Sequence, residues 1–149
     1  MSFTSDEKPI GYFLVRTTRV VKLAFHHAFN QLGIDLTPEQ WVILEQLFHT
    51  NDLSQKDLAD DSFKNAPTIS RIIDVLCKKG WTERIKGTKD KRVIHVHLTD
   101  EGREIVKRVI DRVEYIRAKG WDNLSKSDYK TLLRILNQIF DNYNIDDHE

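Results

Sequence analysis

Strong hydrogen-bond donors are concentrated in one segment of this sequence, residues 64–92. The segment holds nine Lys and Arg residues against three Asp and Glu residues, a local net charge of +6. The whole chain of 149 residues has a formal net charge of zero, so the other residues together carry −6. A basic segment within a neutral chain is typical of nucleic-acid binding, because lysine and arginine pair with phosphate groups. The alternative is a charged surface that contacts only solvent.

The first group of donors lies at the start of a predicted helix, and its members are Lys64, Thr68, Ser70 and Arg71. Arg71 can donate two hydrogen bonds to the O6 and N7 atoms of guanine, and the hydroxyls of Thr68 and Ser70 can reach bases or phosphates. Lys64 just precedes the helix, whose N-terminus favours anions. Thr68, Ser70 and Arg71 lie away from the apolar side of the helix, which consists of Ile69, Ile72, Ile73 and Leu76.

The second group, Asp90, Lys91 and Arg92, lies in a polar loop between two β-prone segments, 81–86 and 92–98. A basic loop at the tip of a hairpin suits the minor groove of DNA, whose negative potential attracts arginine. Asp90 lies two residues before Arg92, so it can orient that side chain by a charge-assisted hydrogen bond. The alternative is an Asp-Lys turn that closes the hairpin and contacts no DNA.

The elements around these groups follow from helical periodicity and from capping residues. Apolar residues recur at helical spacing over residues 10–32, and capping signals start further helices at Thr37, Ser54, Asn65, Thr99 and Ser125. The expected order is four helices, a hairpin and two helices. The predicted fold class is therefore mostly α with a small β-hairpin, and residues 54–98 form a winged helix-turn-helix.

Four ordered segments resemble the MarR family (multiple antibiotic resistance regulators). Residues 54–59 resemble the first helix of its DNA-binding motif, and residues 67–74 resemble its recognition helix. Residues 76–81 resemble the exit into the wing, and residues 90–92 followed by 96–102 resemble the wing signature. The spacing between the segments also fits that family.

The resemblance implies a homodimeric regulator of transcription that binds double-stranded DNA at a pseudo-palindromic operator. It implies a repressor that a small-molecule effector releases from DNA. The chain is then a single winged-helix domain, 1–149, in which residues 9–35 and 103–143 form N- and C-terminal dimerisation helices. Residues 37–102 form the DNA-binding winged helix.

The resemblance also assigns roles to particular side chains. Thr68, Ser70 and Arg71 become contacts of the recognition helix, and Arg92 becomes the minor-groove residue supported by Asp90. The alternative function is a winged-helix module that binds protein without binding DNA. Such a module needs an apolar recognition face, whereas the outward face expected here is polar and charged: Thr68, Ser70, Arg71, Asp74 and Lys78.

An effector pocket, for a small aromatic or phenolic compound, is expected between the dimerisation helices and the winged helix. Tyr12, Arg16 and Trp41 are its candidate lining residues. The preferred alternative is that Trp41 packs in the core and that Arg16 is solvated.

The histidines and the single cysteine are the residues that could support metal or redox chemistry. Of the six histidines, His95 and His97 share a strand face, whereas the adjacent His26 and His27 diverge by about 100° on a helix. We expect no metal and no cofactor. Cys77 is the single cysteine and is interpreted as a packing residue, although Lys78 and Lys79 would favour its thiolate if it were a redox sensor.

The sequence contains no phosphate-binding glycine loop and no nucleophile motif, so we expect a protein that is not an enzyme. The N-terminal residues lack the layout of a signal peptide, and no apolar run reaches the roughly 18–20 residues of a membrane span. We therefore expect a cytoplasmic protein with no membrane partner.

Overall fold

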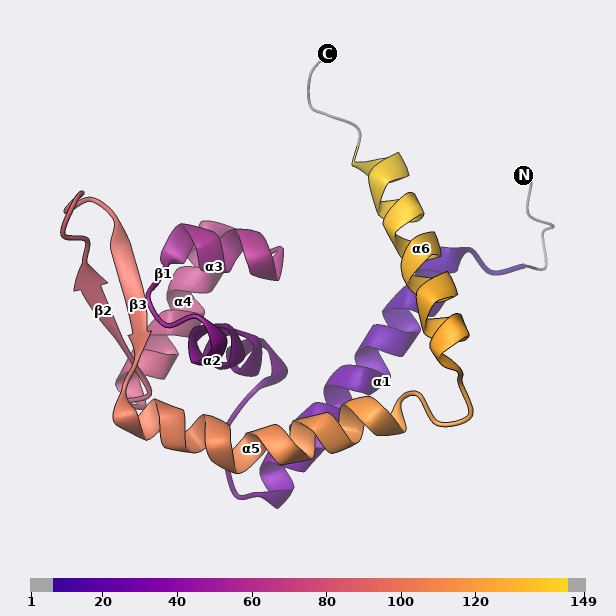
Figure 1. Cartoon of the computed structure of the whole chain (residues 1–149), viewed down its shortest axis with the longest axis horizontal. Coiled ribbons are helices and arrows are strands. Elements are labelled where there is room, and N and C mark those ends of the chain that lie inside the picture. The colour runs from indigo at the N-terminus through magenta and orange to yellow at the C-terminus, as the bar shows by residue number, and fades with distance from the viewer. Residues whose placement is uncertain (1–6, 145–149) are drawn as a thin grey trace, which may run out of the picture. The chain divides into compact units, whose positions relative to one another are not determined.

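The computed structural model describes residues 7–144, and the expected fold class is confirmed (Figure 1). Two compact units make up the chain, one ending at Glu114 and the other beginning at Tyr115. The elements follow in the order α1 Ile10–Gln31, α2 Pro38–His49, β1 Leu53–Ser54, α3 Gln55–Ser62, α4 Ala66–Lys78, β2 Thr82–Lys86, β3 Ile94–Leu98, α5 Asp100–Lys119 and α6 Lys126–Tyr143.

Side-chain caps start the helices where the sequence predicts. The Thr37 hydroxyl accepts from the backbone N–H of Gln40, whose side chain accepts from the backbone N–H of Thr37, both at 3.2 Å. Ser54 and Ser125 form the same reciprocal box with an aspartate, and Asn65 caps α4 through a 2.9 Å bond from the Thr68 backbone N–H. Each cap stabilises its helix by about 1 kcal/mol. Local sequence therefore defines where the helices begin.

One hydrophobic core holds the unit that ends at Glu114. It takes buried side chains from α1, α2, α3, α4, the sheet and the first part of α5. In α4 the buried positions are Ile69, Ile73 and Leu76, as the helical spacing predicts. This packing fixes which side of α4 points outward. The side chains in this core without measurable exposure include Phe29, Leu44, Leu47, Leu58, Val96 and Val106.

The predicted hairpin is confirmed, but it belongs to a three-stranded antiparallel sheet in the order β1-β3-β2. The two-residue strand β1 pairs Leu53 with Val96 and was not expected from the sequence. β3 begins at Ile94 instead of Arg92, so Arg92 remains in the loop of the wing. The extra strand ties the base of the wing to the segment before α3.

The turn between α3 and α4 runs through Phe63, which has a left-handed backbone conformation (φ 54°). This conformation is unusual for a residue with a large side chain, and glycine adopts it at lower cost. The ring is 84% exposed. The turn therefore presents an aromatic side chain at the surface between the two helices of the DNA-binding motif.

The second unit contains α6, and none of the side chains of this helix is buried. Tyr129, Leu132, Leu133 and Phe140 on this helix are each more than two-fifths exposed, whereas Leu136 and Ile139 are half-buried. Among the described helices, none is long and apolar enough to cross a membrane.

Candidate nucleic-acid interface

The structure keeps the predicted α4 residues together at the start of that helix. Arg71 is exposed, whereas Lys64, Thr68 and Ser70 are half-buried. Because Ile69 and Ile73 on the opposite side have no measurable exposure, α4 is anchored with Arg71 pointing away from the core. An exposed guanidinium on a rigid helix can donate two parallel hydrogen bonds to the edge of one base.

Arg84 of β2 links α4 to the wing, a role that sequence reasoning missed. Its guanidinium donates to Asp74 Oδ1 and, through Nε, to Gln55 Oε1, both at 2.6 Å. It also donates to the backbone oxygen of Ser70 at 3.1 Å and to its hydroxyl at 3.4 Å. Ser70 and Asp74, expected on the outward face, are therefore partly engaged within the protein. The alternation of side chains along β2 could have indicated that Arg84 points inward, because Arg84 is on the same strand face as the buried Thr82.

The wing loop carries Asp90, Lys91 and Arg92, and all three are exposed. Asp90 Oδ1 accepts a 2.9 Å hydrogen bond from the backbone N–H of Arg92. Asp90 therefore holds the backbone of the loop. This hydrogen bond differs from the expected one, which joined Asp90 to the guanidinium of Arg92. Only glycine fits at position 87 of this loop, because a Cβ there would lie 2.6 Å from the carbonyl oxygen of Asp90.

A carboxylate and two histidines hold the base of the wing. His95 Nδ1 lies 2.6 Å and His97 Nε2 lies 2.9 Å from the same oxygen, Asp52 Oδ1. The hydrogen bond from His95 lowers the pKa of Asp52, burial opposes the change, and the bond from His97 adds to the lowering. Within residues 7–144, no group of three or more His, Cys, Asp or Glu side chains is arranged to hold a metal ion.

Asp52→Asn is expected to destabilise the protein at pH 6 and to matter less in acid. The pKa of Asp52 is lower in the folded chain, so its contribution to stability is complete above about pH 4, the unfolded value. The contribution is lost as the pH falls through the folded pKa. Urea unfolding of parent and variant at pH 6 and pH 3.5 checks this, and the difference between them should shrink at the lower pH.

Asparagine tolerates the left-handed backbone of Asp52 (φ 80°), so this substitution isolates the charge. Asp61→Asn, at an exposed carboxylate of α3, is the matched control. A destabilisation of equal size at both pH values would show that the carboxylate charge of Asp52 does not hold the wing.

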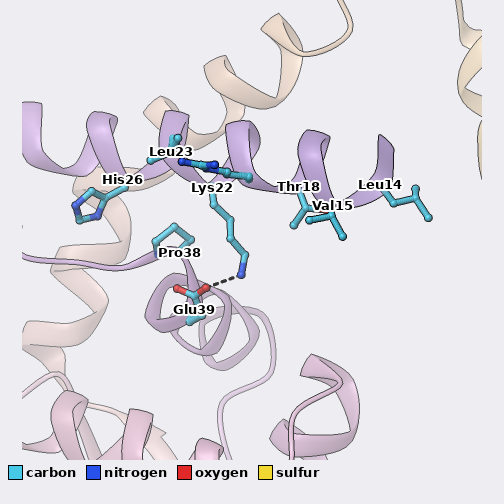
Figure 2. A pocket seen from close by; sticks show the side chains of 9 residues that line it. Leu14, Val15, Thr18, Lys22, Leu23, His26, Pro38 and Glu39 are labelled. Carbon is cyan, nitrogen blue, oxygen red and sulfur yellow. Dashed lines mark hydrogen bonds and ion pairs between the residues drawn. The ribbon is translucent and has the colours of Figure 1, made fainter. Parts of the chain in front are cut away.

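A groove of about 550 Å³ runs between α1 and the first turn of α2 (Figure 2). Lys22 Nζ bridges it to Glu39 Oε1 at 2.7 Å. Burial raises the pKa of Glu39, but the hydrogen bond from Lys22, a backbone hydrogen bond and the charges of Lys22 and Lys64 together lower that pKa below its usual value. The lining combines apolar and basic side chains: Leu14, Val15, Thr18, Arg19, Lys22, Leu23, His26, Pro38 and Glu39.

The three residues suggested for an effector pocket do not line this groove. Trp41 is 2% exposed and packs on Phe29 in the core, which agrees with the preferred alternative. Tyr12 and Arg16 lie together on α1, with the guanidinium 6.0 Å from the Tyr12 ring centre. Cys77 is half-buried, with its sulfur 3.3 Å from the Thr82 hydroxyl.

A family model described as the MarR family matches residues 36–94 of this chain. The HTH-type transcriptional regulator YdcH of Bacillus subtilis (strain 168), described as uncharacterized, is 37% identical over 118 residues. That match covers 76% of this chain and 79% of the relative.

Two solved structures resemble the fold of this chain over almost its whole length. The MepR–DNA complex of S. aureus has a TM-score of 0.83 and 21% identity, with 91% of this chain and 99% of that chain covered. Bordetella bronchiseptica BpsR, whose DNA binding is regulated by 6-hydroxynicotinic acid, has a TM-score of 0.82 and 20% identity. Its match covers 98% of this chain and 100% of that chain.

Proposed function

Because this chain belongs to the MarR family of transcription regulators, we propose that it is a homodimeric repressor released from its DNA operator by a small-molecule effector. Regulators of this family are transcription factors and not enzymes. The proposal also places the protein in the cytoplasm, in contact with the chromosome. The observation that carries it is the orientation of α4. This helix buries its apolar side in the core and leaves Arg71 exposed, and the basic loop of the wing is exposed as well.

The DNA-binding part of the proposal is residues 37–102. Arg71 reads a base edge in the major groove, with Thr68 and Ser70 assisting from the same helix and Lys64 pairing with a phosphate. Lys91 and Arg92 extend from the wing, where the narrow minor groove attracts basic side chains. Asp90 supports the wing by holding the loop backbone. The DNA complex of MepR supports this assignment by its fold.

The dimer is proposed from apolar surfaces that the single chain leaves uncovered. On α1, Val20 is 56% exposed and Val21 is 46% exposed, neither of them lining the groove, and α6 has no buried side chain. Large exposed apolar surfaces mark association sites. We assign residues 9–35 and 103–143 to dimerisation. A two-fold dimer then presents two copies of α4 to a pseudo-palindromic operator with half-sites roughly 34 Å apart.

The effector is proposed to bind in the groove between α1 and α2. Apolar walls from Leu14, Leu23 and Pro38 suit an aromatic ring, and Arg19 and Lys22 offer charge to a carboxylate or phenolate. The regulation of BpsR by an aromatic acid supports the chemical class. In this proposal the effector weakens DNA binding by changing the separation of the two recognition helices.

Selection of sequences from random duplex DNA at two salt concentrations tests the proposed function. An enriched inverted repeat with steep salt dependence is expected, because each phosphate contact releases counterions. Addition of 6-hydroxynicotinate or 4-hydroxyphenylacetate should then release the selected operator, and a promoter that contains it should be silenced by the protein. Absence of enrichment from protein stripped of small molecules would favour a winged-helix module that binds protein.

Arg92→Ala is expected to weaken binding to all duplexes by a similar factor. A wing side chain that pairs with the sugar-phosphate walls contributes affinity and little sequence preference. The slope of log affinity against log salt should fall by about one. Anisotropy titrations with the selected operator and a scrambled duplex measure both quantities. Loss of preference at a single base position, with an unchanged salt slope, would contradict the wing assignment.

A further inference from the structure

Lys79 joins the C-terminal end of α4 to the segment before α2. It is the capping residue of α4, and its side chain is only 20% exposed. Its ammonium donates to the backbone oxygen of Asp35 and lies 3.2 Å from Asp35 Oδ2. The two residues are 44 positions apart in the sequence, so this contact depends on how α4 packs against the segment before α2.

The Lys79 ammonium also reaches the hydrogen bonds that start α2. It lies 3.4 Å from Gln40 Oε1, the oxygen that accepts from the backbone N–H of Thr37. Gln40 is 8% exposed, so this oxygen has little access to water as a substitute partner. A displacement of the first turn of α2 must therefore move the partner of Lys79 or leave the ammonium without it.

The same turn forms one wall of the groove. Pro38 and Glu39 line it, and Glu39 receives the hydrogen bond from Lys22. Consecutive residues thus face in two directions, Glu39 toward the groove and Gln40 toward Lys79 (Figure 2 shows the groove side). On its other side, the Lys79 ammonium lies 4.9 Å from the centre of the Trp81 ring, just before the wing strand β2.

We propose that Lys79 is the positioning residue that transmits occupancy of the groove to the recognition helix. This inference rests on the proposed function. An anionic ligand that draws Lys22 away from Glu39 releases the first turn of α2, and the shift passes through Gln40 and Asp35 to Lys79 and α4. Coupling between two sites on one protein typically changes affinity by about 5- to 150-fold.

A double-mutant cycle on operator binding tests the coupling without a known effector. Lys22→Met breaks the groove pair, and in the parent background it should weaken operator binding by about fivefold or more. In the Lys79→Met background the same substitution should change the operator Kd by less than about twofold. Lys79→Arg, which keeps the cation, should restore the effect of Lys22→Met.

Lys78→Met is the matched control, because Lys78 is an exposed neighbour at the end of the same helix. Whatever it does to the absolute Kd, the effect of Lys22→Met should persist in its presence. If Lys79→Met does not fold, Lys79→Gln, which keeps N–H donors without charge, takes its place in the cycle.

The outcomes separate the two proposals. A parent protein that binds no DNA overturns the proposed function, whereas the coupling fails if the parent binds its operator and Lys22→Met changes nothing. An equal effect of Lys22→Met with and without Lys79 also overturns the inference.

Discussion

Arg71→Ala is expected to weaken binding of the selected operator by roughly 5- to 150-fold, or about 1–3 kcal/mol, and to relax specificity at one base position. The size follows from two parallel hydrogen bonds to a guanine edge, which discriminate against every other base pair at that position. The helix itself should stay intact, because Arg71 is exposed and the anchoring residues Ile69 and Ile73 are unchanged.

Competition titrations with operators changed at each base position measure this effect. Arg108→Ala removes the same side chain from an exposed site on α5 and serves as the control, compared at a concentration where both variants are fully dimeric because Arg108 lies in the proposed dimerisation segment. It should leave both the Kd and the base preference near those of the parent. A uniform loss of affinity across all sequences in Arg71→Ala would mean that Arg71 contacts phosphate and reads no base.

Gly102→Ala is expected to destabilise the protein by about 1–3 kcal/mol or more, the usual cost of an overpacked site. A Cβ at Gly102 would lie 2.0 Å from the carbonyl oxygen and 2.8 Å from the carbonyl carbon of Trp81. Both are backbone atoms and cannot turn aside. The same oxygen accepts the backbone N–H of Thr99 at 3.1 Å, so α5 is fixed against the start of the wing at this point.

Thermal unfolding followed by circular dichroism tests this prediction. A loss of this size should lower the Tm by roughly 2–4 °C per kcal/mol for a chain near 150 residues. Gly11→Ala in α1 is the matched control, because no atom of the same chain lies within 4 Å of its added Cβ, and the folded chain should be as stable as the parent or slightly more so. Equal Tm values for the parent and Gly102→Ala would mean that α5 can shift away from the wing without cost.

The features that the sequence predicts well are those with short-range causes. Thr37, Ser54, Asn65 and Ser125 each bond to a backbone N–H three residues ahead, so the sequence alone reveals these helix starts. The apolar side of α4 follows in the same way from its helical spacing. Resemblance to a family with an ordered set of motifs then identifies the winged helix.

The features that escape prediction depend on contacts between distant positions. Strand β1 has two residues and exists only because Leu53 meets Val96. Arg84 and Lys79 reach partners 29 and 44 positions away, and no local pattern specifies such pairs. Phe63 shows a different difficulty, since its left-handed conformation occurs where glycine would have been the clear signal.

The residues of the candidate site also differ in how far the sequence predicts them. Arg71 and Arg92 could be chosen from sequence because their exposure follows from the helix face and the loop. Core packing is the preferred expectation for Trp41, and the structure confirms it, with Trp41 2% exposed and packed on Phe29. The roles of the DNA-contacting residues stay predictions until operator binding is measured.

The uncovered apolar side of α6 ties the behaviour of the protein to its copy number. If a second chain covers that helix, dimer formation grows with the square of the monomer concentration, and so does the population able to span both half-sites. Dilution of the protein by cell growth would then lower the dimer concentration more steeply than the total protein concentration, and it would relieve repression even with no effector present. A gene under such control would respond as a threshold, and the position of the threshold would be set by how well two copies of one helix pack.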